Sequence, residues 1–282
     1  MDSHKSPKPK RKIKDTVFTD LFGMHKYLRQ LYLVLHPEDS AISEDDLKIC
    51  TLNNILSDQM YNDLGFLARD KLMILVEAQS TWNPWMVLRQ FFYAASELND
   101  YIKANNINIY STSTSTTPIP KPELYMLFTG NRKGIPEVLS LSKEFYEGKP
   151  CDIEVKVHVL RGTKAGSDIV SQYVGFTRVY EEQLAQYGRT KKAIEETIRI
   201  CLDKNILREY LTERQKEVID MATLLFDQDY ADTMRYHEAE QKGRAEGIDV
   251  VFKAKDMLTR GESPETISEI TGLTVKQVLA LR

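Results

Sequence analysis

The run of apolar residues at 72–76, Leu-Met-Ile-Leu-Val, constrains this chain more than any other feature of its sequence. The run is far too short for a membrane-spanning helix, which needs about 20 apolar residues. It is apolar at every position rather than at alternate positions, which is typical of a strand covered by helices on both faces. The sequence therefore predicts a buried strand over residues 72–80 in an α/β core.

A second strand is expected just before it, over residues 59–68, with Arg69-Asp70-Lys71 between the two. If these three residues form the loop of a hairpin, Ala68 pairs with Leu72. Counting back along both strands then places Asp63 opposite Glu77. Side chains in such cross-strand positions have Cβ atoms about 4.5 to 5.5 Å apart, and like charges there repel each other.

A divalent cation would remove this repulsion. Gln79 lies two residues beyond Glu77 and therefore points to the same face of the sheet. Magnesium is commonly held by one or two carboxylates, with waters and phosphate oxygens completing its octahedron. Asp63, Glu77 and the backbone carbonyl of Ala78 are the predicted ligands. The alternative is a register shifted by one or two residues, which leaves Asp63 in a solvated turn and Glu77 at a strand end.

These residues carry a family resemblance. Residues 61–66 (Tyr-Asn-Asp-Leu-Gly-Phe), the apolar strand and residues 77–82 (Glu-Ala-Gln-Ser-Thr-Trp) resemble the active-site hairpin of the PD-(D/E)XK nuclease superfamily. More narrowly, the chain resembles a bacterial family of recombination-promoting nucleases and transposases. The resemblance covers most of the chain from Asp15, and the hairpin is its most specific part.

Matched position by position, Asp63 corresponds to the Asp of the PD element and Glu77 to the acid of the (D/E)XK element. Asn62 stands where the pattern has Pro, a position that only shapes the entry to the strand. Gln79 stands where the pattern has Lys. A neutral amide can orient a water molecule, but it supplies no positive charge and cannot act as a base. The resemblance therefore implies a variant catalytic set of Asp63, Glu77 and Gln79.

The resemblance also implies a fold and an activity. The fold is a restriction-endonuclease-like core, in which helices flank a mixed sheet, followed by an all-helical C-terminal extension. The activity is Mg²⁺- or Mn²⁺-dependent endonucleolytic hydrolysis of DNA, linked to recombination or transposition. Because many nucleases of this architecture pair to cut both strands, a homodimer is expected by analogy.

Three further side chains have a candidate role under this resemblance. Arg89 and Tyr93 are expected to bind DNA phosphates from the helix after Glu77. The alternative is that they belong to a solvated helix face together with Ser96. Family members place an acid on the first helix, where Asp15 could accept a hydrogen bond from a water on the metal. Asp is also a favoured N-cap, and that is the stronger interpretation of Asp15.

The order of the expected elements indicates an α/β core with a helical extension. We expect helices over residues 15–35 and from Asn83-Pro84, and strands over 124–129 and 153–160. Further helices are expected over 167–187, 191–204, 212–226 and 229–260. The apolar face expected for the helix after Pro84 comprises Trp85, Leu88, Phe92, Ala95, Leu98 and Ile102. Trp82 and Trp85 have the chemistry for stacking on bases, although a tryptophan at the start of a helix is more often part of the core.

The expected domains are a basic flexible tail over 1–14, the nuclease core over 15–187, a helical extension over 188–235, and a charged helix with a terminal hairpin over 236–282. Residues 1–14 hold six bases and one acid, a net charge of +5, so the rest of the chain has a net charge of −8 and the whole chain one of −3. Such an arm can add phosphate affinity or be a solubilising tail. The helices expected on either side of Gly272 resemble part of a DNA-binding helix-turn-helix, but their neutral charge favours a packing hairpin.

Composition excludes several classes of protein. With 42% hydrophobic and 28% charged residues, the chain is neither disordered nor fibrous. Its three cysteines form no Cys-x-x-Cys pair, which argues against a zinc cage or a disulfide framework and fits the cytoplasm. Besides a DNA nuclease without membrane contact, two alternatives stay open. One is a catalytically weak relative that binds DNA or protein, and the other is a regulatory helical scaffold.

Overall fold

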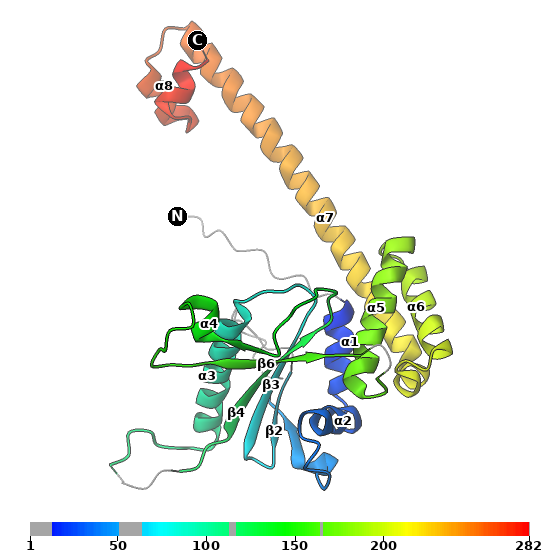
Figure 1. The fold of residues 1–282 in the computed structure, drawn as a ribbon. Coiled ribbons are helices and arrows are strands. Elements are labelled where there is room, and N and C mark those ends of the chain that lie inside the picture. The colour runs from blue at the N-terminus through cyan, green and yellow to red at the C-terminus, as the bar shows by residue number, and fades with distance from the viewer. Residues whose placement is uncertain (1–12, 51–63, 113–116, 164–165, 282) are drawn as a thin grey trace. The chain divides into compact units, whose positions relative to one another are not determined.

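The computed structural model of the chain describes residues 13–50, 64–112, 117–163 and 166–281. It divides into two compact units, Met1–Leu225 and Phe226–Arg282 (Figure 1). The first unit holds the sheet and most of the helices, and the described part of the second is helical. No helix among the described residues is both long and apolar enough to cross a lipid bilayer.

A mixed sheet forms the centre of the first unit. Its six described strands lie in the order β1-β2-β3-β4-β6-β5. The first three are antiparallel to one another, β3, β4 and β6 are parallel, and β5 is antiparallel to β6. The strands are β1 (Leu47–Ile49), β2 (Leu64–Ala68), β3 (Leu72–Gln79), β4 (Lys121–Phe128), β5 (Val138–Ser140) and β6 (Lys156–Arg161).

Helices cover both faces of this sheet, as the apolar run at 72–76 predicts. Helix α3 (Met86–Ala104) packs on one face, while α1 (Ile13–Phe22), α2 (His25–Leu35) and α5 (Ile169–Tyr187) lie on the other (Figure 1). Met73 and Leu75 of β3 belong to the core under α3. Because side chains alternate along a strand, Ile74 and Val76 point to the opposite face, where both are fully buried. The α/β class is thus confirmed.

The hairpin formed by β2 and β3 has the predicted register. Ala68 pairs with Leu72 and Leu64 pairs with Val76. The three-residue loop is possible because Arg69 and Asp70 both adopt positive φ angles, of 49° and 54°. Residues 59–63, including Asp63, lie outside the described residues.

The N-terminal helical segment differs from the prediction. Instead of one helix over 15–35, the chain forms α1 and α2, which are separated at Gly23. The break lets each helix bury its own apolar face, since Phe18 and Phe22 of α1 pack edge-on against Tyr173 of α5. Asp15 lies in the first turn of α1 rather than at its N-cap, so that interpretation is wrong.

Short elements were not foreseen from the sequence. These are β1, β5, the 3₁₀ turn at Glu44–Asp46 and α4 (Leu141–Phe145). Each is too short to show a hydrophobic period. Strand β4 begins three residues before the predicted start, while β6 begins three residues after it and leaves Ile153 exposed.

The C-terminal helices follow the prediction except at one place. Helix α6 (Lys191–Asp203) begins after Thr190, and α8 (Pro264–Thr271) and α9 (Val275–Leu279) are separated by Gly272 at a φ of 74°. The helices expected over 212–226 and 229–260 form the single helix α7 (Arg208–Thr259), because no Gly or Pro interrupts residues 226–229. Helix α7 is kinked at Arg214, whose backbone angles are not helical.

In the second unit, α8 and α9 pack on the end of α7. Ala254 and Met257 of α7 form a buried cluster with Ile267 of α8 and Val278 of α9. The hairpin expected around Gly272 therefore buries Ile267 and Val278 within its own unit, while Ile270 and Leu279 stay exposed.

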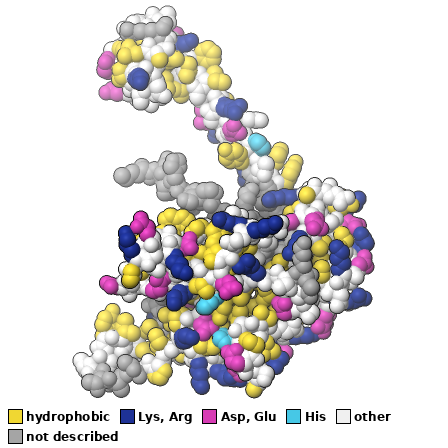
Figure 2. Space-filling view, in the orientation of Figure 1, with side chains coloured by type: hydrophobic (Ala, Val, Ile, Leu, Met, Phe, Trp, Pro, Cys, Tyr) yellow, Lys and Arg dark blue, Asp and Glu magenta, His cyan; other side chains and the backbone are white. Residues whose placement is uncertain are grey.

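A polar network joins the end of α2 to β4. His36 Nε2 lies 2.9 Å from Glu123 Oε2, and its Nδ1 lies 3.1 Å from Glu38. Glu123 also accepts hydrogen bonds from Lys121 at 2.9 Å and from the Tyr125 hydroxyl at 3.0 Å. Figure 2 shows histidine side chains lying among acidic ones on one face of the first unit. The network ties α2 to the centre of the sheet.

This network makes stability depend on pH. Burial opposes ionisation of Glu123, but the hydrogen bonds from Lys121 and Tyr125 and the charge on His36 lower its pKa from 4.5. Because the folded pKa is the lower one, the ionised carboxylate stabilises the fold above about pH 4.5, and this stabilisation is lost as pH falls through the folded value.

We therefore expect Glu123→Gln to lower the free energy of unfolding by about 2 kcal/mol near neutral pH. The difference from the wild type should shrink as pH falls from about 4.5 through the lowered pKa of folded Glu123, because the carboxyl then becomes neutral like the amide. Urea unfolding at several pH values measures this. The exposed Glu147→Gln is the control and should have little effect at any pH. A loss for Glu123→Gln that does not change with pH would contradict the expectation.

Candidate functional site

The candidate site lies at the C-terminal end of β3, which finishes with Glu77, Ala78 and Gln79. The Glu77 side chain is only 4% exposed, and it faces α3, where Arg89 bonds to it. Alternation along the strand directs Gln79 to the same face. In a parallel sheet, ligands bind beyond the carboxyl ends of the strands, and β3 is parallel to β4. The position of Glu77 is therefore one from which a side chain can do chemistry.

The orientation of α3 differs from the prediction. Trp85 and Phe92 of the expected apolar face are 60% and 49% exposed. The buried residues of α3 are instead Met86, Val87, Gln90, Tyr93 and Ala94. Leu88 and Leu98 of the expected face are partly buried against the same core. Both sets recur at helical spacing, so the period alone does not say which one meets the sheet.

Because of this orientation, Arg89 and Tyr93 point toward β3 rather than outward. The Arg89 guanidinium donates to Glu77 Oε1, and one of its nitrogens lies 3.4 Å from the Tyr93 hydroxyl. Ser96, expected on the same stripe, is exposed. The result is a buried carboxylate neutralised by a guanidinium that is itself 34% exposed.

Gln90 supports this arrangement, although sequence reasoning missed it. Its side chain is fully buried, and Nε2 donates to the backbone carbonyl of Tyr125 in β4 at 3.2 Å. The bond fixes α3 against the sheet one residue away from Arg89. In the sequence, Gln90 is a polar residue beside Arg89 in an otherwise apolar part of the helix. That pattern does not predict its burial, because the sequence does not show which face of the helix packs on the sheet.

The structure does not test one predicted site residue, Asp63, and places another, Asp15, away from Glu77. Asp63 lies outside the described residues, so its place opposite Glu77 stays a prediction. Asp15 lies in α1, which belongs to the helical layer on the face opposite α3 (Figure 1). Lys14, counted with the basic tail, also belongs to α1, and it bonds to Glu181 of α5 at 2.5 Å.

The residues at this end of β3 fit a hard divalent cation. Carboxylate, amide and backbone carbonyl oxygens are the ligands that Mg²⁺ accepts, and the fold already pairs the Glu77 carboxylate with a cationic group. Within the described ranges, no three His, Cys, Asp or Glu side chains gather closely enough to form a metal site by themselves. A site here would rest on Glu77 and its strand neighbours, with Asp63 as the predicted second acid.

The two loops that leave this end of the sheet lie side by side. The Thr129 amide donates to the Gln79 carbonyl at 2.9 Å. Gly130 packs so closely that a Cβ there would lie 2.1 Å from the Ser80 carbonyl oxygen. Residues 80–85 and 129–136 therefore form one rim next to Glu77.

Both tryptophans of the chain lie in this rim. The Trp82 ring contacts Phe128 edge-on at 6.1 Å, and the Arg132 guanidinium lies 5.4 Å from its centre. Trp85 rests against Phe145 of α4 at 4.9 Å, but most of its surface is open to solvent. The interpretation of Trp85 as part of the core is therefore wrong.

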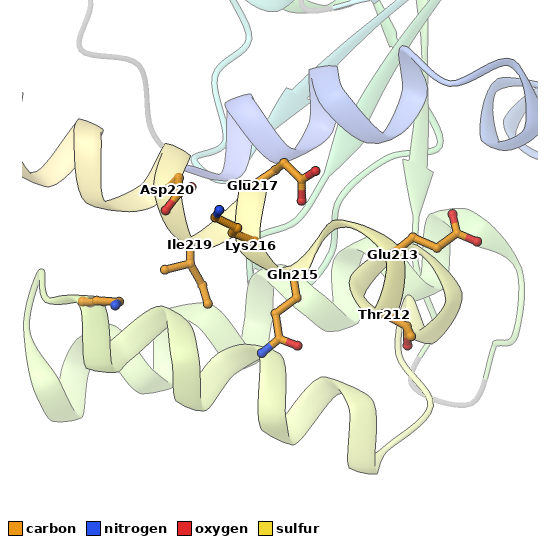
Figure 3. Close-up of a pocket in the computed structure, with 8 residues that line it drawn as sticks. Thr212, Glu213, Gln215, Lys216, Glu217, Ile219 and Asp220 are labelled. Atoms are coloured by element: carbon orange, nitrogen blue, oxygen red, sulfur yellow. The ribbon is translucent and has the colours of Figure 1, made fainter.

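A separate hollow of about 480 Å³ lies between α6 and the start of α7 (Figure 3). Its lining mixes bases such as Lys191 and Lys216 with acids such as Glu213 and Asp220, and includes no residue of β3 or α3. It offers no buried polar group to a ligand, so the end of β3 is the better candidate.

Comparisons with protein-family models, curated proteins and solved structures find no match to this chain. Its function is therefore inferred from its own residues and geometry.

Proposed function

We propose that the chain is a metal-dependent endodeoxyribonuclease with a restriction-endonuclease-like core. The observation that carries this proposal is the buried Glu77 at the end of a central strand, beside Arg89 and Tyr93. The register of the β2–β3 hairpin supports it, because it is the register from which the sequence predicts Asp63 opposite Glu77. The order of an antiparallel hairpin, a helix and a parallel strand also agrees with this fold.

Each residue has a role in this proposal. Asp63, Glu77 and the Ala78 carbonyl would hold Mg²⁺ or Mn²⁺. When bound, the ion lowers the pKa of water at the site and stabilises negative charge on the phosphate. Gln79 would orient the attacking water through its amide. Arg89 would bind the scissile phosphate through its two-pronged guanidinium, and Tyr93 would donate to the same group.

The wider context of this proposal comes from the family resemblance. It comprises DNA as the partner, a homodimer that cuts both strands, a cytoplasmic location, and a role in recombination or transposition. None of these follows from the geometry at Glu77.

One observation favours a second candidate function. The Arg89 guanidinium bonds to the Glu77 carboxylate where a metal ion would otherwise bind. In addition, Gln79 replaces the lysine of the superfamily pattern. A protein with such a site could bind DNA or a protein partner without cutting. The two candidates differ in whether DNA is cleaved when metal is present.

We expect the wild type to nick supercoiled plasmid DNA with Mg²⁺ or Mn²⁺, and Asp63→Asn and Glu77→Gln each to lose at least about 100-fold in rate. Agarose electrophoresis of the plasmid measures this, and circular dichroism confirms that each variant is folded. Glu195→Gln, an exposed acid on α6, is the matched control and should cut like the wild type. Activity that persists in both acid variants would show that the site is wrong. A wild type that binds DNA but does not cut it with either metal would favour the second candidate.

A further inference from the structure

The rim next to Glu77 combines positive charge with exposed aromatic surface. Residues 80–85 contain no charged side chain, and residues 129–136 contain Arg132 and Lys133 but no acid. Both basic side chains are exposed. Since the chain as a whole has a net charge of −3, this is a local excess of positive charge. It is the electrostatic character expected of a surface that binds phosphate groups.

The aromatic part of the rim is held in place rather than loose. Trp82 is fixed between Phe128 and Arg132, and Trp85 is supported by Phe145. The close approach of Gly130 to Ser80 keeps the two loops together. Rigid, supported indoles lose little conformational entropy when a flat partner stacks on them.

The rim is continuous with the candidate site. Phe128, which contacts Trp82, pairs with Gln79 in the parallel β3–β4 ladder. Trp85 lies one helical turn before Arg89, whose amide donates to the Trp85 carbonyl at 3.0 Å. A strand of nucleic acid lying on this rim would therefore pass directly beside Glu77.

We infer that this rim binds single-stranded nucleic acid, with Trp85 stacking on an unpaired base and Arg132 and Lys133 binding the flanking phosphates. An exposed indole face can stack on a base only when that base is unpaired and splayed out, because bases in a duplex already stack on one another. The inference rests on the proposed function, because it describes how the proposed nuclease would bind its DNA. It assigns to the nuclease a contact with unpaired bases of its DNA substrate.

Charge argues against a second copy of the chain as the occupant. Two copies of a rim that carries Arg132 and Lys133 and no acid would repel each other if placed face to face. Single-stranded nucleic acid is complementary to this surface, because its phosphates match the positive charge and its bases match the exposed indole.

The chain offers a direct probe, because Trp82 and Trp85 are its only tryptophans. Intrinsic tryptophan fluorescence therefore reports on this rim alone. We expect a dT oligonucleotide of about 15 nucleotides to quench it saturably without divalent metal, and the same strand annealed to its complement to bind at least about tenfold more weakly. Fluorescence anisotropy of the labelled oligonucleotide gives the affinities.

The variants separate stacking from charge. Trp85→Ala should weaken single-strand binding about tenfold, and Trp85→Phe should retain most of it, because the phenyl ring can still stack. The double variant Arg132→Ala/Lys133→Ala should weaken binding and reduce its dependence on salt. Phe92→Ala, an exposed aromatic residue further along the same helix, is the matched control and should bind like the wild type.

Equal affinity for duplex and single strand, or unchanged binding by Trp85→Ala, would overturn the inference. So would concentration-dependent self-association without any quenching by oligonucleotide, which would identify the rim as a protein interface. The same titration on Glu77→Gln distinguishes this inference from the proposed function, because this variant should still bind the oligonucleotide although it does not cut. Binding without cleavage by the wild type keeps the inference and removes the nuclease, whereas cleavage without quenching does the reverse.

Discussion

Replacing Arg89 by Met is expected to lower the free energy of unfolding by about 3 kcal/mol. The Glu77 carboxylate is 4% exposed, and the substitution removes the guanidinium that neutralises it. Removing one partner of a buried ion pair is costly because the remaining charge stays in a low-dielectric environment. Because Arg89 itself is partly exposed, we expect the lower end of the usual range. Urea unfolding at neutral pH measures the change.

The partner variant tests the cause. Adding Glu77→Gln to Arg89→Met removes the buried charge, so the double variant should regain most of the lost stability. Tyr93→Phe, which removes only the hydroxyl 3.4 Å from Arg89, should cost about 1 kcal/mol or less. If Arg89→Met is as stable as the wild type, solvent rather than Arg89 balances the charge on Glu77.

Metal connects this stability to the proposed function. A divalent cation that binds folded protein at Glu77 should raise the melting temperature of Arg89→Met more than that of the wild type, because no guanidinium competes for the carboxylate. A shift of the same size in both proteins would place the metal elsewhere.

Phe18→Ala is expected to cost about 3 to 5 kcal/mol. Phe18 is fully buried, with its ring centre 4.9 Å from that of Phe22 and 5.3 Å from that of Tyr173. The substitution leaves a cavity at the contact between α1 and α5 and removes two edge-on aromatic contacts. Thermal and urea unfolding both report on the loss.

Phe92→Ala provides the matched comparison. Phe92 also lies on an apolar stripe of a helix, but its side chain is 49% exposed, so its loss should change stability by about 0.5 kcal/mol or less. A large loss for Phe92→Ala would mean that the outer face of α3 is covered in solution. The two variants thus test which apolar stripes belong to the core.

Local patterns predicted several elements correctly. The apolar run at 72–76 identified the central strand, because a strand covered on both faces has few sequence alternatives. The three residues 69–71 determined the register of the hairpin, since a loop of that length leaves only one pairing for Ala68. The helices expected on either side of Gly272 form as α8 and α9, and Ser263 and Thr274 cap them through their own side chains.

The wrong predictions have a common cause: each depends on contacts between elements, which the local sequence pattern does not determine. Helix α3 carries two apolar stripes, and the period gives no reason to bury Tyr93 rather than Phe92. The break at Gly23 depends on how Phe18 and Phe22 meet α5, a contact about 150 residues away along the chain. Three-residue strands such as β1 exist only because a neighbouring strand pairs with them.

The candidate site divides in the same way. Glu77 and Gln79 were identified from their place on a strand, because alternation and loop length are local properties of the sequence. Only the tertiary structure decided that Arg89 turns inward to neutralise Glu77, that Gln90 anchors α3 on β4, and that Trp85 stays in solvent. The rotation of a helix about its own axis is set by its packing against the sheet. That packing brings together residues that are far apart in the sequence, so the spacing of residues within the helix does not predict it.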